Sequence, residues 1–247
     1  MNITVILNGY NRGHLLQEQL KSVQKQTIPP EDIMMWYNKG SEPQVQVPKI
    51  KKAAYCTHNF SFFGRFAFAL LAQTEYVAIF DDDTIPGNKW FENCLNCMKT
   101  HPGILGASGV IFQDLNNYLK SISFGTHTKN NNILQVDLVG HSWFIKKEWL
   151  KYMWMEEPYS YENGEDFHLS YSCQKYGNIK TYVPPHDPNN RETWGSLKPE
   201  LGSDNKANYK KQDHYLIRTK CLQHYVNYGW CLLKEKDKHE ITPWLWE

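Results

Sequence analysis

Three consecutive carboxylates, Asp81, Asp82 and Asp83, follow directly on an apolar run at residues 76–80. Neighbouring carboxylates repel one another, and each raises the free-energy cost of ionising the next. Two interpretations account for them: a solvated turn, or a site that holds positive charge. The Asp-x-Asp spacing suits a divalent cation, because hard oxygen ligands favour Mg²⁺ or Mn²⁺. Such ions commonly carry phosphate oxygens as further ligands, so the sequence indicates a metal–diphosphate site here.

A second acidic pair, Glu165 and Asp166, opens a segment with a helical pattern. Carboxylates are favoured at a helix N-terminus, so these two residues alone favour an ordinary acidic helix start.

Haloacid-dehalogenase phosphatases also use an Asp-x-Asp motif, but theirs follows the first strand and has Thr or Val at the fifth position. Here the motif comes later and the fifth position is Ile85, which disfavours that class.

The elements that must position these carboxylates alternate between strand and helix patterns. Strands are expected at residues 3–7, 33–37 and 76–80, with helices from residue 14 onward, around 63–71 and at 88–99. This alternation predicts βαβ units and a largely parallel sheet. Ligands of such sheets bind beyond the carboxyl ends of the strands, which is where the three aspartates fall.

Beyond residue 100 the pattern changes to short strands separated by Asn-rich turns, which predicts a mixed sheet. Strands are expected at 104–112, 118–124, 133–139 and 178–183, and helical signals occur at 146–154 and 165–176. Residues 184–208 are dense in Pro, Asn, Gly and charge and are interpreted as a long surface loop. Residues 213–233 are compatible with a helix.

Composition narrows the class of protein. The chain carries 27 basic and 26 acidic residues, and this net charge of +1 gives no reason to expect a nucleic-acid partner. Six scattered cysteines are too few for a disulfide framework in 247 residues. We find no signal-peptide pattern and no segment apolar enough to span a bilayer. A cytoplasmic protein is therefore expected, with peripheral contact to a membrane left open.

Four blocks resemble, in order, the family-2-type GT-A glycosyltransferases. They are ITVILNGYNRGHLLQEQLKSVQKQT, HNFSFFGRFAFALLAQTEYVAIFDDDTIP, VGHSWFIKKEWL and ENGEDFHLSYSCQKYGNIKTYVPP, and they span about residues 3 to 186. The first two are similar to that family's opening strand–loop–helix and to its Asp-x-Asp strand with the preceding helix. The last two resemble its acceptor-side segment and its Glu-Asp helix. A looser resemblance is to a glycosyltransferase encoded by large chlorella-infecting viruses, for which the location would be the host cytoplasm.

The resemblance implies an α/β protein of GT-A fold at residues 1–186. Its nucleotide-binding half, 1–100, would be mainly parallel βαβ, and its acceptor half, 101–186, a mixed sheet. Residues 187–247 would form a C-terminal loop and helical extension packed on the same domain. The implied activity is metal-dependent transfer of a sugar from a nucleoside diphosphate, preferentially UDP, to a hydroxyl of a glycan or glycoconjugate, with inversion. Mn²⁺ or Mg²⁺ would be the cofactor.

Residue by residue, the resemblance makes Asp83 a direct metal ligand. Asp81 would meet the ribose or the metal and its water. Asp82, counted with the nucleotide-sugar-binding residues, would point back into the protein or to a neighbouring donor. Arg65 matches a basic position that touches the aspartates or the diphosphate, for which a planar, permanently charged guanidinium is suited. The nucleotide pocket would also be lined by Asn8, Tyr10, Asn11 and Arg12. Many family members have an acidic pair after the second strand, where this chain has Asn38, which could hydrogen-bond a uracil edge.

On the acceptor side, the resemblance makes Asp166 the general base and puts Glu165 beside the donor. His186, just past the last sheet strand, is where several GT-A enzymes have a third metal ligand, although a surface histidine is an equal interpretation. Trp143 would either stack on a sugar ring or belong to the core.

Two other functions remain open. One is a non-catalytic nucleotide- or carbohydrate-binding module on the same fold. The other is a sugar nucleotidyltransferase, which usually needs a Gly-rich basic loop after the first strand. The sequence NGYNRGHL provides only Gly9, Arg12 and Gly13 there, which disfavours it.

Overall fold

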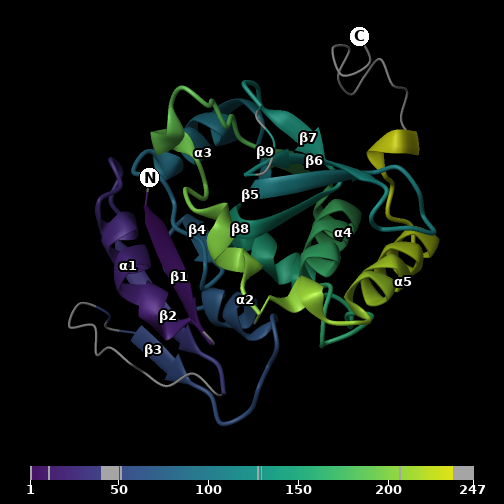
Figure 1. The fold of residues 1–247 in the computed structure, drawn as a ribbon, viewed down its shortest axis with the longest axis horizontal. Coiled ribbons are helices and arrows are strands. Elements are labelled where there is room, and N and C mark those ends of the chain that lie inside the picture. Colours follow the sequence, from purple (N-terminus) through teal and green to yellow (C-terminus); the bar gives the residue numbers. More distant parts are fainter. Residues whose placement is uncertain are drawn as a thin grey trace.

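The computed structural model describes residues 2–10, 12–39, 50, 52–126, 128, 130–205 and 207–235. Within them, nine strands form one sheet with helices packed around it (Figure 1). The order along the sheet is β3-β2-β1-β4-β8-β5-β9-β7, and β6 pairs with β5 outside that path.

The first four strands are parallel, as the alternating pattern predicted. They are β1 (Ile3–Gly9), β2 (Asp32–Tyr37), β3 (Lys52–Tyr55) and β4 (Tyr76–Phe80). All five residues of β4 are buried, which fits a continuous apolar run covered on both faces of the sheet. The sequence analysis missed β3, a mostly exposed edge strand without an apolar pattern.

The second half of the sheet is mixed, as expected. Its strands are β5 (Gly103–Phe112), β6 (Ser121–Gly125), β7 (Leu134–Val136), β8 (Leu138–Lys146) and β9 (Lys180–Val183). β8 is antiparallel to both β4 and β5, whereas β9 is parallel to β5. The single strand expected at 133–139 is instead divided between β7 and β8, and the helix expected at 146–154 is a 3-10 helix, η2 (Lys147–Trp154).

Each face of the sheet contributes to its own hydrophobic core. One core contains residues of two helices, α1 (Leu16–Gln24) and α3 (Trp90–Thr100), packed with residues such as Ala78. The 3-10 turn η1 (Gly13–Leu15) directly precedes α1. The other core contains residues of α2 (Gly64–Ala69), η2 and α4 (Glu165–Gly177), packed with Val77 and Ile79. Because successive strand side chains point to opposite faces, β4 joins both cores.

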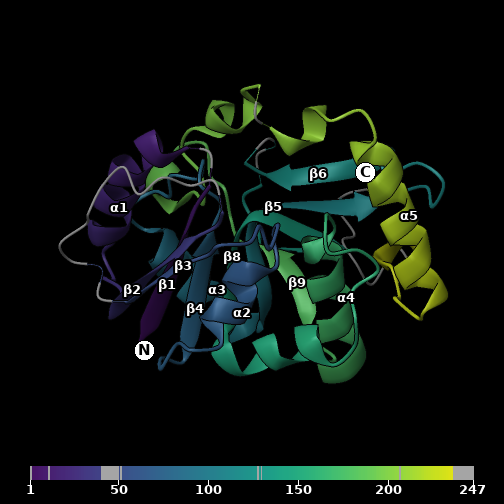
Figure 2. The same ribbon diagram turned by 90° about the horizontal axis from the view of Figure 1, so that it is seen from below.

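The segment after β9 is more structured than the expected surface loop. It contains three short 3-10 helices, η3 (Arg191–Thr193), η4 (Pro199–Ser203) and η5 (Asn208–Lys210), and it leads into α5 (His214–Asn227) and η6 (Leu233–Glu235). α5 lies beside α4 in both views (Figures 1 and 2), and the two helices share a third core that includes Phe167 and Leu222. Among the described residues, no helix is both long and apolar enough to cross a membrane.

Candidate functional site

A cavity of about 670 Å³ opens beyond the carboxyl ends of β1 and β4. Its walls also include β5, β6, β8 and the start of α4, and the C-terminal segment from Pro199 to Arg218 closes one side. Ten of the predicted site residues line it: Asn8, Tyr10, Arg12, Arg65, Asp81, Asp82, Asp83, Trp143, Glu165 and Asp166. At the carboxyl ends of these strands, the fold therefore brings together predicted residues from widely separated parts of the chain.

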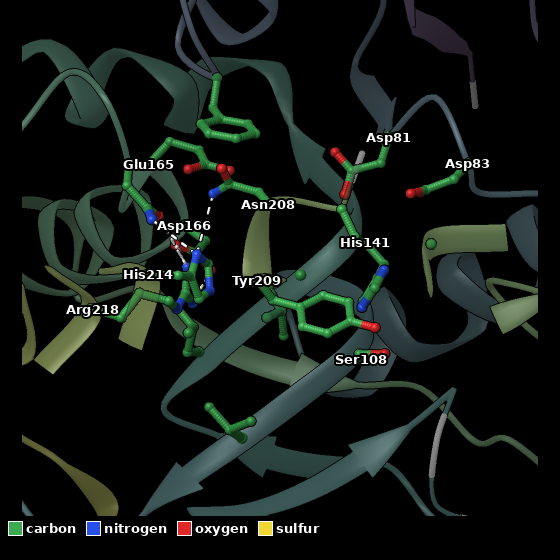
Figure 3. A pocket seen from close by; sticks show the side chains of 18 of the residues that line it. Asp81, Asp83, Ser108, His141, Glu165, Asp166, Asn208, Tyr209, His214 and Arg218 are labelled. Atoms are coloured by element: carbon green, nitrogen blue, oxygen red, sulfur yellow. Dashed lines mark hydrogen bonds and ion pairs between the residues drawn. The ribbon is translucent and has the colours of Figure 1, made fainter. Parts of the chain in front are cut away.

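The turn that carries the three aspartates is fixed from two sides. Gln19, buried on α1, donates its side-chain amide to the carbonyl oxygens of Asp81 (2.7 Å) and Thr84 (2.8 Å). On the other side, the carbonyl oxygen of His141 accepts the Asp81 backbone N–H at 3.3 Å and the Thr84 hydroxyl at 2.9 Å. These bonds hold the turn at the end of β4 with its carboxylates directed to the cavity (Figure 3).

Among the described residues, Asp81, Asp83 and His141 form a group that could hold a metal ion. One ligand atom from each lies within 4.8 Å of the others. His141 lies where β8 bulges against β5, and its φ of 65° is in the left-handed region, which non-glycine residues seldom adopt. Burial raises the pKa of Asp83, and the carboxylates of Asp81 and Asp82 raise it further. Two carboxylates and an imidazole fit Mn²⁺, and Mg²⁺ with less preference for the nitrogen.

Arg12 neutralises one part of this acidic cluster. Its NH1 lies 2.9 Å from Asp82 and 3.0 Å from Asp83, while Nε and NH2 bind Asp204 at 2.9 and 2.8 Å. Burial acts to lower the pKa of Arg12, but these carboxylates outweigh it and raise that pKa. Asp82 therefore accepts a hydrogen bond from Arg12.

Arg65 crosses from the aspartates to the acidic pair of α4. It is 2% exposed, pairs with Asp81 through NH1, and lies 3.3 Å from Glu165 through NH2. Burial, followed by the charge of Asp166, raises the pKa of the Glu165 carboxyl. Arg65 thus joins the two acidic groups that the sequence analysis singled out separately.

Asp166 lies at the first turn of α4 and is paired with Arg218 of α5. Arg218 NH2 is 2.6 Å from Oδ2, and NH1 donates to Oδ1 at 3.3 Å. Both side chains are buried, with relative exposures of 6% and 8%. In Figure 3 this pair and His214 lie on one side of the cavity, the Asp81–Asp83–His141 group lies on the other, and Tyr209 projects between them.

The geometry corrects the predicted roles of His186 and Asn38 and decides between the two interpretations of Trp143. His186 is fully buried and lies outside the cavity lining, with Nδ1–H donating to the Pro184 carbonyl at 2.9 Å and Nε2 accepting the Gly195 N–H at 3.3 Å. Because both ring nitrogens serve the fold, His186 is not oriented as a metal ligand, and burial lowers its pKa to about 4. The histidine in the group that could hold a metal ion is His141.

Asn38 has a structural role, and Trp143 belongs to the core, which was one of its two interpretations. The amide of Asn38 donates to Asn59 (2.7 Å) and to the Ser61 carbonyl (3.1 Å) and accepts the Phe60 N–H, so it organises the loop before α2 and does not line the cavity. Trp143 reaches the cavity lining but is only 2% exposed, and the Arg65 guanidinium lies 4.8 Å from its ring centroid. Its ring thus supports Arg65 and has no open face for a sugar.

The predictions for the first strand have mixed outcomes. Asn8 and Tyr10 line the cavity, and the hydroxyl of Tyr10 accepts a hydrogen bond from Asn59 at 3.3 Å. Asn11 lies outside the described residues. Their nucleotide contacts remain predictions.

Three residues that the sequence analysis missed are central to the geometry: His141, Asp204 and Arg218. Asp204 and Arg218 come from the segment interpreted as loop and extension, and neither carries a motif. For His141, the only sequence signal is the Gly-His pair that interrupts an apolar strand, a weak indication of a bulge.

Comparisons with known proteins address the fold. No protein-family model matches the sequence, and no curated protein matches it. Among solved structures, it is similar to S. aureus TarS residues 1–349, with a TM-score of 0.54 and 16% identity over 76% of this chain and 59% of that one. The UDP-GlcNAc complex of TarS 1–349 gives a TM-score of 0.56 and covers 76% of this chain and 57% of that one. A further TarS structure gives a TM-score of 0.55 and covers 81% of this chain and 38% of that one. Both have 16% sequence identity to this chain.

The chain thus spans about three fifths or less of the length of these structures. At 16% identity the similarity concerns the fold alone. The mixed α/β architecture, with parallel strands ending at the acidic turn, agrees with that similarity. The chain has the GT-A fold.

Proposed function

We propose that this protein is a metal-dependent glycosyltransferase that moves a sugar from a UDP-sugar to a hydroxyl of a glycan or glycoconjugate, with inversion at the anomeric carbon. The acidic cluster on the donor side carries the proposal. One ligand atom each from Asp81, Asp83 and His141 lies within 4.8 Å of the others, and the ion pairs of Arg12 and Arg65 bring the carboxylates of Asp82, Glu165 and Asp204 to the same region. A dication at Asp81, Asp83 and His141 would add positive charge to this cluster.

The chemistry of the donor side follows from these groups. Mn²⁺ or Mg²⁺, when bound, acts as a Lewis acid that stabilises negative charge on the departing diphosphate. Arg12 and Arg65 lie beside the proposed ligands and offer further positive charge to phosphate oxygens. TarS has been solved with UDP and with UDP-GlcNAc, which supports UDP as the nucleotide.

The acceptor side contributes the base. Asp166 would remove the proton from the acceptor hydroxyl, which then attacks the anomeric carbon opposite the leaving UDP. Attack from that side inverts the configuration. The cavity around Asp166 includes the rings of Tyr209 and Tyr215, which are 40% and 36% exposed, and such partly exposed rings suit a sugar acceptor.

The test is a thermal-shift screen of UDP-GlcNAc, UDP-glucose, UDP-galactose and UDP, each with and without MnCl₂. A ligand at a hundredfold excess over its Kd stabilises the folded state by about 2.7 kcal/mol. Stabilisation should need both metal and nucleotide, and Asp83→Asn should abolish the metal-dependent part. Equal shifts with and without MnCl₂, or an unchanged response of Asp83→Asn, would contradict the proposal.

One observation favours a second candidate, the non-catalytic binding module. The Arg218 ion pair occupies part of the carboxylate that would act as base. Release of UDP from a UDP-sugar by the unaltered protein, and its loss in Asp166→Asn, would establish the enzyme. Metal-dependent binding without any release would establish the module.

A further inference from the structure

Arg218 is a buried cation that forms an ion pair with the carboxylate of Asp166. Besides the two contacts with Asp166, its NH1 donates to the side-chain oxygen of Asn163 at 3.4 Å. The guanidinium lies 4.6 Å from the ring centroids of both Tyr118 and Phe167. Two aromatic rings and three polar contacts therefore fix the plane of the guanidinium.

This plane in turn fixes Asp166. A planar guanidinium binds a carboxylate through two parallel N–H groups, so the carboxylate must lie in a matching orientation. Oδ1 receives a further hydrogen bond from the Phe167 backbone N–H at 3.0 Å. Within the described part of the chain, Oδ2 has no hydrogen-bond donor other than Arg218, so one of its lone pairs remains for another proton.

The pair also offsets the free-energy cost of burying two charges. A buried charge is costly unless it is paired and hydrogen-bonded. Asp166 and Arg218 are both buried, and each provides the opposite charge for the other. The Asp166 carboxylate outweighs the effect of burial on the pKa of Arg218 and raises that pKa, so the partner of Asp166 is a permanent cation.

We propose that Arg218 of α5 is the positioning residue of the general base: it holds the Asp166 carboxylate in the orientation in which Oδ2 faces the acceptor hydroxyl. This inference rests on the proposed function, and it makes the C-terminal helix part of the catalytic unit. The contact joins positions 52 residues apart. The opposing explanation is that Arg218 only ties α5 to α4.

The experiment measures kcat and KM for UDP release from the UDP-sugar of the panel that stabilises the protein most, with MnCl₂. Variants are Arg218→Gln, Arg218→Lys, Arg218→Ala, Asp166→Asn and Asp166→Asn/Arg218→Gln. Lys220→Gln, an exposed position on the same helix, is the matched control. Urea unfolding of each variant and the metal-dependent thermal shift with UDP show whether the fold and the donor site persist.

For a positioning role, Arg218→Gln should lower kcat on the order of 100-fold, the scale of general-base catalysis, with KM changed less than about twofold. Arg218→Lys should recover part of kcat, because it restores charge without the second N–H contact. Added guanidinium should partly rescue Arg218→Ala. The double variant should be no slower than Asp166→Asn alone, because the two residues act as one unit.

Two results would overturn this inference and leave the proposed function standing. One is a kcat of Arg218→Gln within about twofold of that of the unaltered protein. The other is a kcat of the double variant that is reduced by the product of the two single reductions. A loss of metal-dependent UDP binding in parallel with kcat would show a structural tie and also overturn it. Failure of the proposed function looks different, because the unaltered protein itself would then release no UDP from any sugar nucleotide of the panel.

Discussion

Arg12 and Asp204, 192 residues apart, are joined by two parallel hydrogen bonds of 2.9 and 2.8 Å. The same guanidinium reaches Asp82 and Asp83 with its remaining nitrogen. Gly202, two residues before Asp204, lies so close to Asp83 that a Cβ there would come within 3.2 Å of the Asp83 carboxylate oxygen. The C-terminal segment is therefore fastened directly over the acidic turn of β4.

Asp204→Asn should loosen this fastening. The Asp204 side chain is 39% exposed, so solvent screening limits the loss to about 1 kcal/mol or less. In a chain of this size that corresponds to a fall in Tm of about 2–4 °C. Hydrogen exchange of the backbone at residues 199–210 should quicken, as measured by mass spectrometry. Glu200→Gln, an exposed carboxylate in the same segment, is the control, and equal effects of the two changes would contradict the assignment.

His141→Asn tests the third metal ligand. Asparagine tolerates the left-handed φ of this position better than most residues, so the substitution removes the imidazole and preserves the backbone. Changing a partner of a metal ligand commonly costs 10–100-fold in affinity, and losing the ligand itself should cost at least about tenfold. Isothermal titration with MnCl₂ measures the change. Manganese affinity equal to that of the unaltered protein would exclude His141 as a ligand.

The parts of the fold that could be predicted are those that short stretches of sequence indicate by their pattern of apolar and charged residues. β4 was predicted with its observed bounds because a run of buried apolar residues stops at three charges. Gln19 shows the limit, because nothing in an amphipathic helix indicates which polar side chain turns inward to hold a distant turn. The sequence therefore indicated where the site lies but not what supports it.

The errors have the same physical origin. His186 follows a strand and two prolines, a context typical of an exposed ligand, but Trp90 and Trp194 pack against its ring in the folded chain. Asp204 and Arg218 gain their roles only through contacts across 192 and 52 residues. Such pairings depend on tertiary packing, which neither periodicity nor motif spacing encodes.

His186 should make stability depend on pH. Burial lowers its pKa from 6.5 to about 4, so the folded protein favours the neutral ring. The resulting stability is fully present above pH 6.5 and is lost as the pH falls toward 4. Between pH 7.5 and pH 5 the loss from this group should be about 2 kcal/mol. Urea unfolding at both values, in the unaltered protein and in His186→Gln, measures it.

The comparison concerns the slope with pH and not the absolute stability, since His186→Gln also changes two hydrogen bonds. His214, whose pKa burial likewise lowers to about 4, contributes to both proteins and cancels in the difference. An identical loss in both proteins would contradict the burial of His186. A metal affinity reduced in His186→Gln as much as in His141→Asn would restore His186 as a ligand.

Glu165→Gln should flatten a slope of the opposite sign. Burial first, and then the neighbouring charge of Asp166, raises the pKa of Glu165, although Arg65 and Arg218 offset part of this. A carboxyl whose pKa is raised in the folded state stabilises the protein at pH values below its ordinary pKa of 4.5. That stability is lost as the pH rises through the pKa of the folded state.

In EDTA, the free energy of unfolding of the unaltered protein should therefore fall with rising pH by more than that of Glu165→Gln. Glu162→Gln, at an exposed position three residues earlier, should keep the slope of the unaltered protein. If Glu165→Gln kept it as well, the ion pair with Arg65 would hold Glu165 charged in the folded state, and the raised pKa of Glu165 would be contradicted.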